Sequence, residues 1–420
     1  MFFNRNLDNT IFVQIASYRD PELVPTLNSL FENARFPENL TVAVAWQRDE
    51  SESLGPYINH PQVKVLDIPY QDAKGVCWAR NLLQYLYSGQ KYSLQLDSHH
   101  RFIKDWDVEY IEMLVNLQEK GFPKPLITSY LPSYDPATGE KVDMPWKLAF
   151  QRFLPEGPAF PIPHTIDNFK SLTQPIRGKF YSAHFAFTLG EFCREVPHDP
   201  NLYFHGEEPS IAIRAFTWGY DIFHPHKVLG WHEYTREGKK KHWDDNPWID
   251  ENNTSYKRYR KLFSIGEEKY DENEFGRFGL GKVRSLQDYI KYSGLDPTRK
   301  LVQQCILDDI EPPAPQYSSE EEFLKSFLNF NKYCINLHKT DLPEGVNDYD
   351  FWVIAIKDKD KKDIVRLDAD EQEVNTLISS MANDWIIIWR DWFSATEPAF
   401  WAVWPHSKSK GWLELIERPL

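Results

Sequence analysis

Two residues near position 100 have the types and the spacing of metal ligands. Asp97 and His99 follow a mostly apolar run, 92–96, which predicts a buried strand that ends here. Side chains alternate between the faces of a strand, so we expect the carboxylate and the imidazole to converge and His100 to face elsewhere. An oxygen ligand beside a nitrogen ligand suits Mn²⁺ or Mg²⁺ holding a diphosphate. An ordinary polar strand end can carry the same pair, so the interpretation depends on the neighbouring motifs.

Adjacent carboxylates form a second candidate group. Gly206 precedes Glu207 and Glu208, and apolar residues then recur with helical spacing as far as Trp218 and Gly219. Carboxylates in the first turn of a helix are favoured by the helix dipole, so these two could simply cap the helix. The alternative is that they face a substrate.

Basic residues lie on either side of these groups along the chain. Lys74 and Arg80 fall in the first and second turns of a helix predicted immediately before the Asp97 strand. A helix N-terminus with an arginine is a suitable diphosphate site, and a surface salt bridge is the alternative for Arg80. Arg236 and the lysines 239–241 predict either a mobile loop that closes on a diphosphate or a solvated run of charge.

The elements that must position these groups begin with three buried strands. Residues 10–17, 40–46 and 63–68 are rich in β-branched side chains, and Asp20 with Pro21 marks the start of a helix after the first of them. This order predicts parallel pairing with right-handed crossovers. We therefore expect an α/β sheet whose opening half binds a nucleotide at the carboxyl ends of its strands.

Composition limits the partners and the compartment. The 420 residues carry a formal charge of −14, which disfavours nucleic acid or an anionic membrane as a partner. The four cysteines are scattered, as in a reduced cytoplasmic protein. Residues 1–6 lack an apolar leader, and no apolar run is long enough to cross a bilayer. A cytoplasmic location without a transmembrane segment is expected.

The motifs together resemble those of GT-A-fold nucleotide-sugar transferases. Residues 95–102 (Gln-Leu-Asp-Ser-His-His-Arg-Phe) and 15–20 (Ile-Ala-Ser-Tyr-Arg-Asp) are similar to the GlcNAc-transferases of glycosyltransferase family 60, whose eukaryotic members modify a hydroxyproline in the cytosol. Residues 75–81 resemble the element that supplies an arginine near the nucleotide, and 206–208 resemble the acidic loop of retaining enzymes. The resemblance spans about residues 10–260 and implies a GT-A fold, with a Rossmann-like sheet and flanking helices.

The resemblance also implies roles for single residues. The third metal ligand is expected among the late histidines, with His232 first and His226 second. His184 is placed near the donor sugar, although a hydrogen-bonded core histidine would fit the same pattern. The implied sets are Asp97, His99 and His232 for the metal, Mn²⁺ or Mg²⁺; Ser17, Arg19, Lys74, Arg80, Asp97, His184 and Arg236 for the donor; and Glu207, Glu208 and Arg80 for catalysis on the acceptor side.

The function implied is metal-dependent, retaining transfer of a sugar, GlcNAc from UDP-GlcNAc, to a hydroxyl of a protein or glycan. Two alternatives are a metal-dependent hydrolase that activates water and a non-catalytic sugar-binding or scaffold protein. The sequence identifies neither the acceptor nor the oligomeric state, and a homo-oligomer is possible.

A change in composition near residue 311 divides the chain. We expect a catalytic domain over 1–310, a linker and bridging helix over 311–345, and a small β-rich α+β module over 346–420. The linker signal is the proline-rich run at 311–316, followed by an acidic helix. Tryptophans of the C-terminal module could bind glycan or polypeptide, but packing in its core or at a dimer interface explains them as well.

Overall fold

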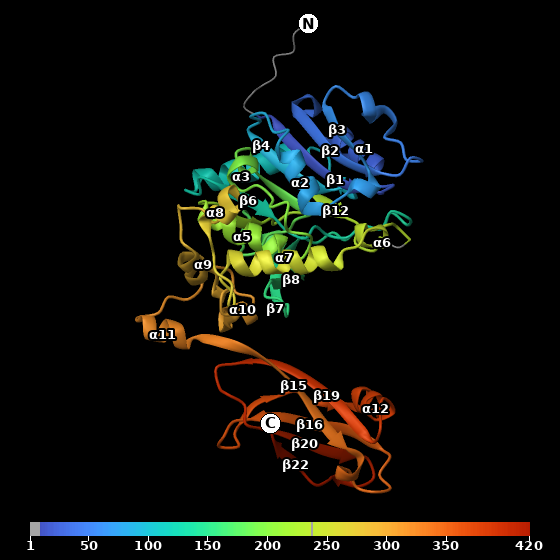
Figure 1. Ribbon diagram of the computed structural model, residues 1–420, viewed down its shortest axis with the longest axis vertical. Coiled ribbons are helices and arrows are strands. Elements are labelled where there is room, and N and C mark those ends of the chain that lie inside the picture. The colour runs from blue at the N-terminus through green and yellow to red at the C-terminus, as the bar shows by residue number, and fades with distance from the viewer. Residues whose placement is uncertain (1–8, 237) are drawn as a thin grey trace. The chain divides into compact units, whose positions relative to one another are not determined.

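The computed structural model describes residues 9–236 and 238–420, which divide into two compact units (Figure 1). The first unit runs to Lys300 and includes 305–316, and the second comprises 301–304 and 317–420. The N-terminal residues 1–6, expected to lack a leader, lie outside the described range. Within that range no helix combines the length and the apolar character needed to cross a membrane.

An eight-stranded mixed sheet organises the first unit, in the order β3-β2-β1-β4-β10-β6-β11-β9. Strands β1 to β4 are parallel, as the sequence predicts, and β10 is antiparallel to both of its neighbours. The strands are β1 (Ile11–Tyr18), β2 (Leu40–Arg48), β3 (Val63–Pro69), β4 (Tyr92–Asp97), β6 (Pro125–Thr128), β9 (Ile176–Arg177), β10 (Phe185–Leu189) and β11 (Asp221–His224).

Helices cover both faces of this sheet. Helices α1 (Leu23–Asn33) and α3 (Trp106–Glu119) share one apolar cluster with residues such as Val13 of β1. Helix α2 (Val76–Gln84) shares another with the alternate residue Phe12. Because both faces are covered, the central strands are apolar almost throughout rather than alternating. The predicted α/β fold class, a large sheet with flanking helices, is confirmed.

The remaining elements of the first unit are two small sheets and several helices. A two-stranded sheet pairs β5 with β12, and a hairpin pairs β7 with β8. These elements are β5 (His100–Phe102), β7 (Trp146–Phe153), β8 (Ala159–Thr165), β12 (Gly230–His232), β13 (Leu295–Asp296), α4 (Phe192–Glu195), α5 (Glu207–Thr217), α6 (His242–Asp245), α7 (Ile249–Leu262), α8 (Glu272–Phe275), α9 (Leu286–Ser293) and α10 (Gln304–Leu307).

The second unit is built from antiparallel strands around its own core, in which Trp352 is fully buried. The elements are α11 (Glu320–Lys325), α12 (Glu371–Ser379), β14 (Leu301–Gln303), β15 (Phe327–His338), β16 (Tyr349–Lys357), β17 (Asp363–Arg366), β18 (Ala369–Asp370), β19 (Trp385–Ser394), β20 (Phe400–Ser407), β21 (Gly411–Trp412) and β22 (Ile416–Pro419). β15 falls in the range expected to be a linker, and it pairs with β19 from Asn329 to His338.

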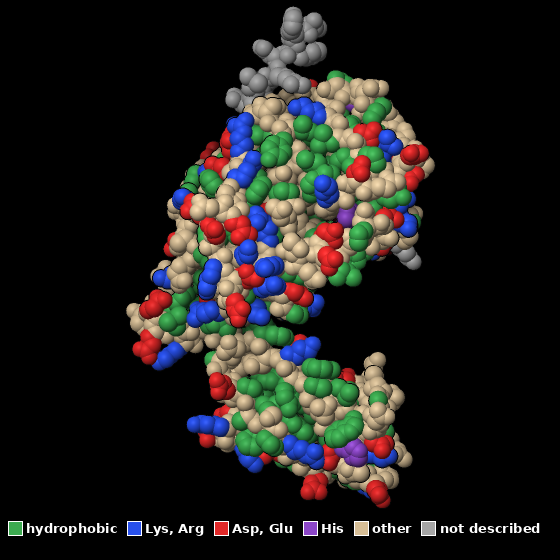
Figure 2. All heavy atoms as spheres, in the orientation of Figure 1, with side chains coloured by type: hydrophobic (Ala, Val, Ile, Leu, Met, Phe, Trp, Pro, Cys, Tyr) green, Lys and Arg blue, Asp and Glu red, His purple; other side chains and the backbone are tan. Residues whose placement is uncertain are grey.

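Hydrophobic side chains also gather on the surface of the second unit (Figure 2). Trp385, Ile387 and Trp389 alternate along β19 and are exposed, whereas Trp352 and Trp401 are buried. The tryptophans of this unit therefore divide between core packing and the surface, where Trp404 of β20 and Trp412 of β21 are also exposed.

Candidate active site

A cavity of about 490 Å³ lies at the carboxyl ends of β1 and β4. Ligands of α/β sheets bind in this place, where connections leave the strands in different directions. The lining includes Tyr18, Arg80, Asp97, His99, Tyr130, His184, Phe204, Glu207, Glu208, His232, Arg236, His242 and Trp243. Most of the residues predicted to do chemistry therefore line one cavity.

Asp97, His99 and His232 meet at the base of this cavity. Asp97 ends β4, His99 lies in the bend that follows, and His232 ends β12. The Nε2 atoms of His99 and His232 lie 3.9 and 3.7 Å from Asp97 Oδ2. One ligand atom from each residue lies within 4.8 Å of the others. The structure thus brings together the three predicted metal ligands.

His100 also points into this region, contrary to the expectation that it faces elsewhere. The chain leaves β4 after Asp97 and bends into β5, so strand alternation does not continue from Asp97 to His100. In the antiparallel pair of β5 with β12, His100 is directly opposite His232, and their ring centroids are 4.9 Å apart. His226, the alternative third ligand, lines a separate cavity beside Glu109.

Asp20 fixes the orientation of His99. Its Oδ2 accepts hydrogen bonds of 2.7 Å from His99 Nδ1 and from Ser98 Oγ. Burial opposes ionisation, but the hydrogen bond from His99 and the charge of Arg236 hold the pKa of Asp20 well below its usual range. Donation from Nδ1 leaves the lone pair on His99 Nε2, the atom that faces Asp97. The sequence predicts only a helix-capping role for Asp20, although the residue stands within the motif 15–20.

Arg80 is buried between two carboxylates. Its side chain is 4% exposed, Nη2 donates to Asp97 Oδ1 over 2.6 Å, and Nη1 donates to both Glu207 oxygens over 2.7 Å. The alternative of a surface salt bridge is therefore wrong. Burial would raise the pKa of Glu207, but Arg80 and His198 lower it to about 2. Burial acts in the same direction on Asp97, and Arg80 holds its pKa well below the usual range.

The start of helix α2 explains why Arg80 reaches the site and Lys74 does not line it. The helix begins at Val76, after Gly75 with φ 97°, so Lys74 precedes the helix and does not lie in its first turn. A Cβ on Gly75 would lie 2.9 Å from the Tyr203 ring, so only glycine fits this close approach. Lys74 is exposed, and its ammonium lies 5.9 Å from the centroid of the Trp78 ring.

Glu208 faces the cavity with a different protonation from that of its neighbour Glu207. Its two oxygens accept hydrogen bonds from Ala183 N over 2.8 Å and from Tyr130 Oη over 2.9 Å. Burial raises the pKa of Glu208 to about 7. Environments that separate two neighbouring carboxylates in this way are typical of acid–base sites. The sequence gives no signal for Tyr130.

His184 lies just before β10, which begins at Phe185. Its Nε2 accepts a hydrogen bond from Leu131 N over 3.1 Å, and Nδ1 lies 3.2 Å from Ser182 Oγ. The ring stacks on His232 with 4.1 Å between centroids. His184 is thus a hydrogen-bonded buried histidine that also lines the cavity.

The end of β1 and the basic loop meet at the cavity mouth. Arg19, with φ 44°, donates from Nη1 to Asp245 Oδ2 over 2.8 Å, and Tyr18 Oη donates to the same oxygen over 3.0 Å. Arg236 Nη2 lies 3.5 Å from Asp20 Oδ2. Ser17 is buried and its Oγ has no partner in the described part of the chain; Ala16 and Tyr18, rather than Ser17, line the cavity.

The donor set at Asp97, His99 and His232 fits a divalent cation. Both ring nitrogens of His232 are buried and lack hydrogen-bond partners among residues 9–236 and 238–420. Burial lowers the pKa of His232 to about 4, so its imidazole is neutral at pH 7, as metal ligation requires. One carboxylate and two imidazoles suit Mn²⁺ among other divalent ions.

The comparisons with known proteins define the class. Residues 10–59 and 55–299, more than half of the chain, match the family model described as Glycosyltransferase (GlcNAc), and the chain belongs to this family of glycosyltransferases. A search of curated protein sequences finds no match.

Several solved structures are similar. GalNAc-T7 with UDP, GalNAc and Mn²⁺ has 16% identity and a TM-score of 0.47 over 67% of this chain. The match spans 54%, about half, of the GalNAc-T7 chain. TarS from S. aureus with UDP-GlcNAc has 13% identity and a TM-score of 0.38, over 63% of this chain and 69% of its own. The mannosyltransferase PcManGT from Pyrobaculum calidifontis, with GDP-Man and Mn²⁺, has 12% identity and a TM-score of 0.36, over 55% and 58%.

Proposed function

We propose that this glycosyltransferase moves GlcNAc from UDP-GlcNAc to a hydroxyl of a protein or glycan in the cytoplasm, with retention of the anomeric configuration. Within the GlcNAc transferases we assign it to family 60. One observation carries the proposal: Asp97, His99 and His232 converge in the cavity that also contains Arg80 and Glu208.

Asp97, His99 and His232 would hold the Mn²⁺ or Mg²⁺ ion. When bound there, the ion supplies positive charge against the charge that develops on the leaving diphosphate. Asp20 keeps the Nε2 lone pair of His99 directed at the site, and Arg80 keeps Asp97 ionised and fixed. These contacts preorganise the ligands before the donor arrives.

The two glutamates have separate roles in this proposal. Glu207 is neutralised by Arg80 and acts through it as a positioning residue. Glu208 faces the cavity, contacts the acceptor hydroxyl, and with a pKa of about 7 can hold its proton near neutral pH. The bond from the anomeric carbon to the diphosphate oxygen breaks, a bond from that carbon to the acceptor oxygen forms on the same face of the sugar, and the hydroxyl proton passes to the leaving diphosphate oxygen.

The donor contacts follow the cavity from β1 to β12. We assign the diphosphate to Arg80 and Arg236, which line the cavity. Ser17 and Arg19 do not line it, so their contact with the uridine remains a prediction from the sequence. His184 is assigned to the sugar. Lys74, which is exposed outside the lining, remains a prediction from the sequence.

The test is UDP release from UDP-GlcNAc, with and without Mn²⁺, by the wild type and Asp97→Asn. Asp221→Asn is a matched control, because Asp221 pairs with Arg284 over 3.0 Å outside the cavity. We expect Mn²⁺-dependent release that Asp97→Asn abolishes and the control retains. Nucleotide release from UDP-GalNAc and GDP-mannose, compared with release from UDP-GlcNAc, tests the identity of the donor. NMR of the product shows whether the anomeric configuration is retained.

The outcomes separate the alternatives. A hydrolase would release UDP equally well with water and with an added hydroxyl acceptor. A non-catalytic scaffold would bind UDP-GlcNAc without releasing UDP. The proposal fails if UDP-GlcNAc is neither bound nor turned over in the presence of Mn²⁺.

A further inference from the structure

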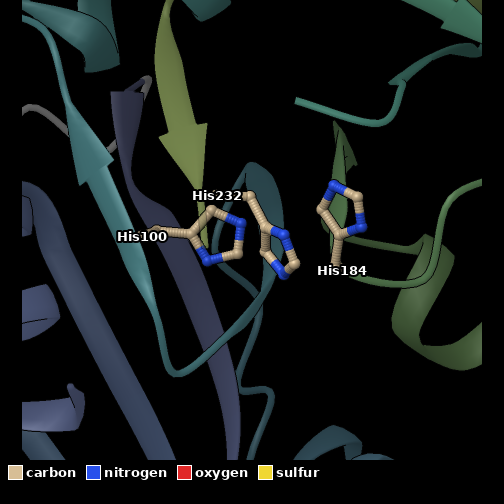
Figure 3. A group of neighbouring side chains, drawn as sticks. All are labelled: His100, His184 and His232. Carbon is tan, nitrogen blue, oxygen red and sulfur yellow. The ribbon is translucent and has the colours of Figure 1, made fainter. Parts of the chain in front are cut away.

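Three buried histidines, His100, His184 and the proposed metal ligand His232, form a cluster. Figure 3 shows the imidazole of His232 between those of His100 and His184. Its ring centroid is 4.9 Å from that of His100 and 4.1 Å from that of His184. One nitrogen from each residue lies within 4.8 Å of the other two. The spacing therefore allows one ion to contact all three rings.

The cluster contains buried nitrogens without partners. His100 is fully buried; its Nδ1 donates to the Asp97 carbonyl over 3.0 Å, which leaves a lone pair on Nε2. That Nε2 and both nitrogens of His232 have no hydrogen-bond partner in the described parts of the chain. Buried polar atoms are normally satisfied, and a neutral imidazole carries one lone pair, so His100 Nε2 and one nitrogen of His232 offer lone pairs that a cation could accept.

His184 has its lone pair on the nitrogen that the Leu131 amide approaches. Leu131 N donates to His184 Nε2 over 3.1 Å, so this imidazole is in the neutral form that binds metals. A cation bound by Nε2 replaces that one hydrogen bond. All three rings come from fixed positions: β5, β12 and the segment before β10.

We propose that His100, His184 and His232 form a second cation site, selective for Zn²⁺. Three imidazoles without a carboxylate favour Zn²⁺, whereas the oxygen of Asp97 makes the neighbouring set more suitable for Mn²⁺. His232 belongs to both sets. Zn²⁺ at the three-histidine site withdraws His232 from the Mn²⁺ site and inhibits transfer. Zn²⁺ binding is independent of the proposed function, whereas the inhibition rests on it.

The test uses the full chain and a chromophoric chelator that competes for Zn²⁺. His100→Gln should weaken Zn²⁺ binding at least about tenfold, because it removes a ligand. His224→Gln is the matched control: His224 is buried, its Nδ1 is 2.6 Å from the Thr128 carbonyl, and its Nε2 is unpartnered among the described residues, but it belongs to neither ligand group. This control should bind Zn²⁺ like the wild type.

The competing explanation is that Zn²⁺ occupies the Mn²⁺ site. His99→Gln should therefore weaken Mn²⁺ binding and leave Zn²⁺ binding within about threefold. The proposal is overturned if His99→Gln removes Zn²⁺ binding and His100→Gln does not. Anomalous diffraction at the zinc edge, on crystals of the wild type, distinguishes the two sites without a variant. A peak among the three histidines supports the proposal, and a peak beside Asp97 overturns it.

Inhibition is measured separately. Zn²⁺ should inhibit the wild type and inhibit His100→Gln at least about tenfold less, each relative to its own activity without Zn²⁺. If no transferase activity exists, the proposed function fails while the chelator competition still decides the zinc site.

Discussion

Replacing Glu208 with glutamine should stabilise the protein at pH 8 and leave its stability unchanged at pH 4.5. The pKa of Glu208 rises from 4.5 to about 7 on folding, chiefly through burial. Between these values the folded state holds a proton that the unfolded state has lost, so stability falls as pH rises. The rise from 4.5 to about 7 corresponds to about 3 kcal/mol of lost stability at pH 8.

The adjacent Glu207 should behave in the opposite way. Its folded pKa is lowered to about 2 despite burial, because Arg80 and His198 stabilise the carboxylate. It contributes stability that is fully present above pH 4.5 and is lost as the pH falls towards 2. Glu207→Gln should therefore destabilise by about 3 kcal/mol at pH 7, and this difference should shrink in acid.

The assay is urea unfolding of the wild type and both variants between about pH 3 and pH 8, so that the range includes the acid loss expected for Glu207. Hydrogen exchange of peptides from β1 and β4 reports the first unit separately from the second. At pH 7 to 8 we expect Glu208→Gln to raise the free energy of unfolding and Glu207→Gln to lower it. If Glu208→Gln changes the free energy of unfolding equally at pH 5 and pH 8, the raised pKa of Glu208 is refuted.

Three further variants test separate contacts. Asp20→Ala should weaken Mn²⁺ binding by about 10- to 100-fold in calorimetry, because His99 loses its orienting partner; unchanged affinity would contradict that role. Arg80→Met should destabilise the first unit by about 3 kcal/mol or more, because it leaves two carboxylates without their partner. Arg48→Met is the control, because it removes the more exposed ion pair of Arg48 with Asp67 and should change stability by less than about 1 kcal/mol. Equal destabilisation by the two arginine variants would contradict the buried network. Trp352→Ala should destabilise the second unit by about 3–5 kcal/mol in urea, whereas a neutral effect would contradict its place in that core.

Local patterns predict the elements that carry their own periodicity or composition. The helix expected after Asp20 and Pro21 is found as α1, and the first strand is found as β1. The apolar runs and helix signals are properties of neighbouring residues, so a single sequence shows them. The positions of Asp97 and His99 follow from the end of one such strand.

Contacts between distant segments are not visible in those patterns. The Asp20–His99 hydrogen bond joins residues 79 apart, and the Arg80–Glu207 pair joins residues 127 apart. His100 enters the site through the register of β5 with β12, which local alternation does not specify. For the same reason β15, whose partner β19 lies far along the chain, was expected to be part of a linker.

The metal position can be measured directly by anomalous diffraction at the manganese edge, on crystals grown with Mn²⁺ and UDP. We predict one peak within coordination distance of Asp97 and of the Nε2 atoms of His99 and His232, with the UDP diphosphate beside it. UDP bound elsewhere, or a peak remote from Asp97, would contradict the proposed site.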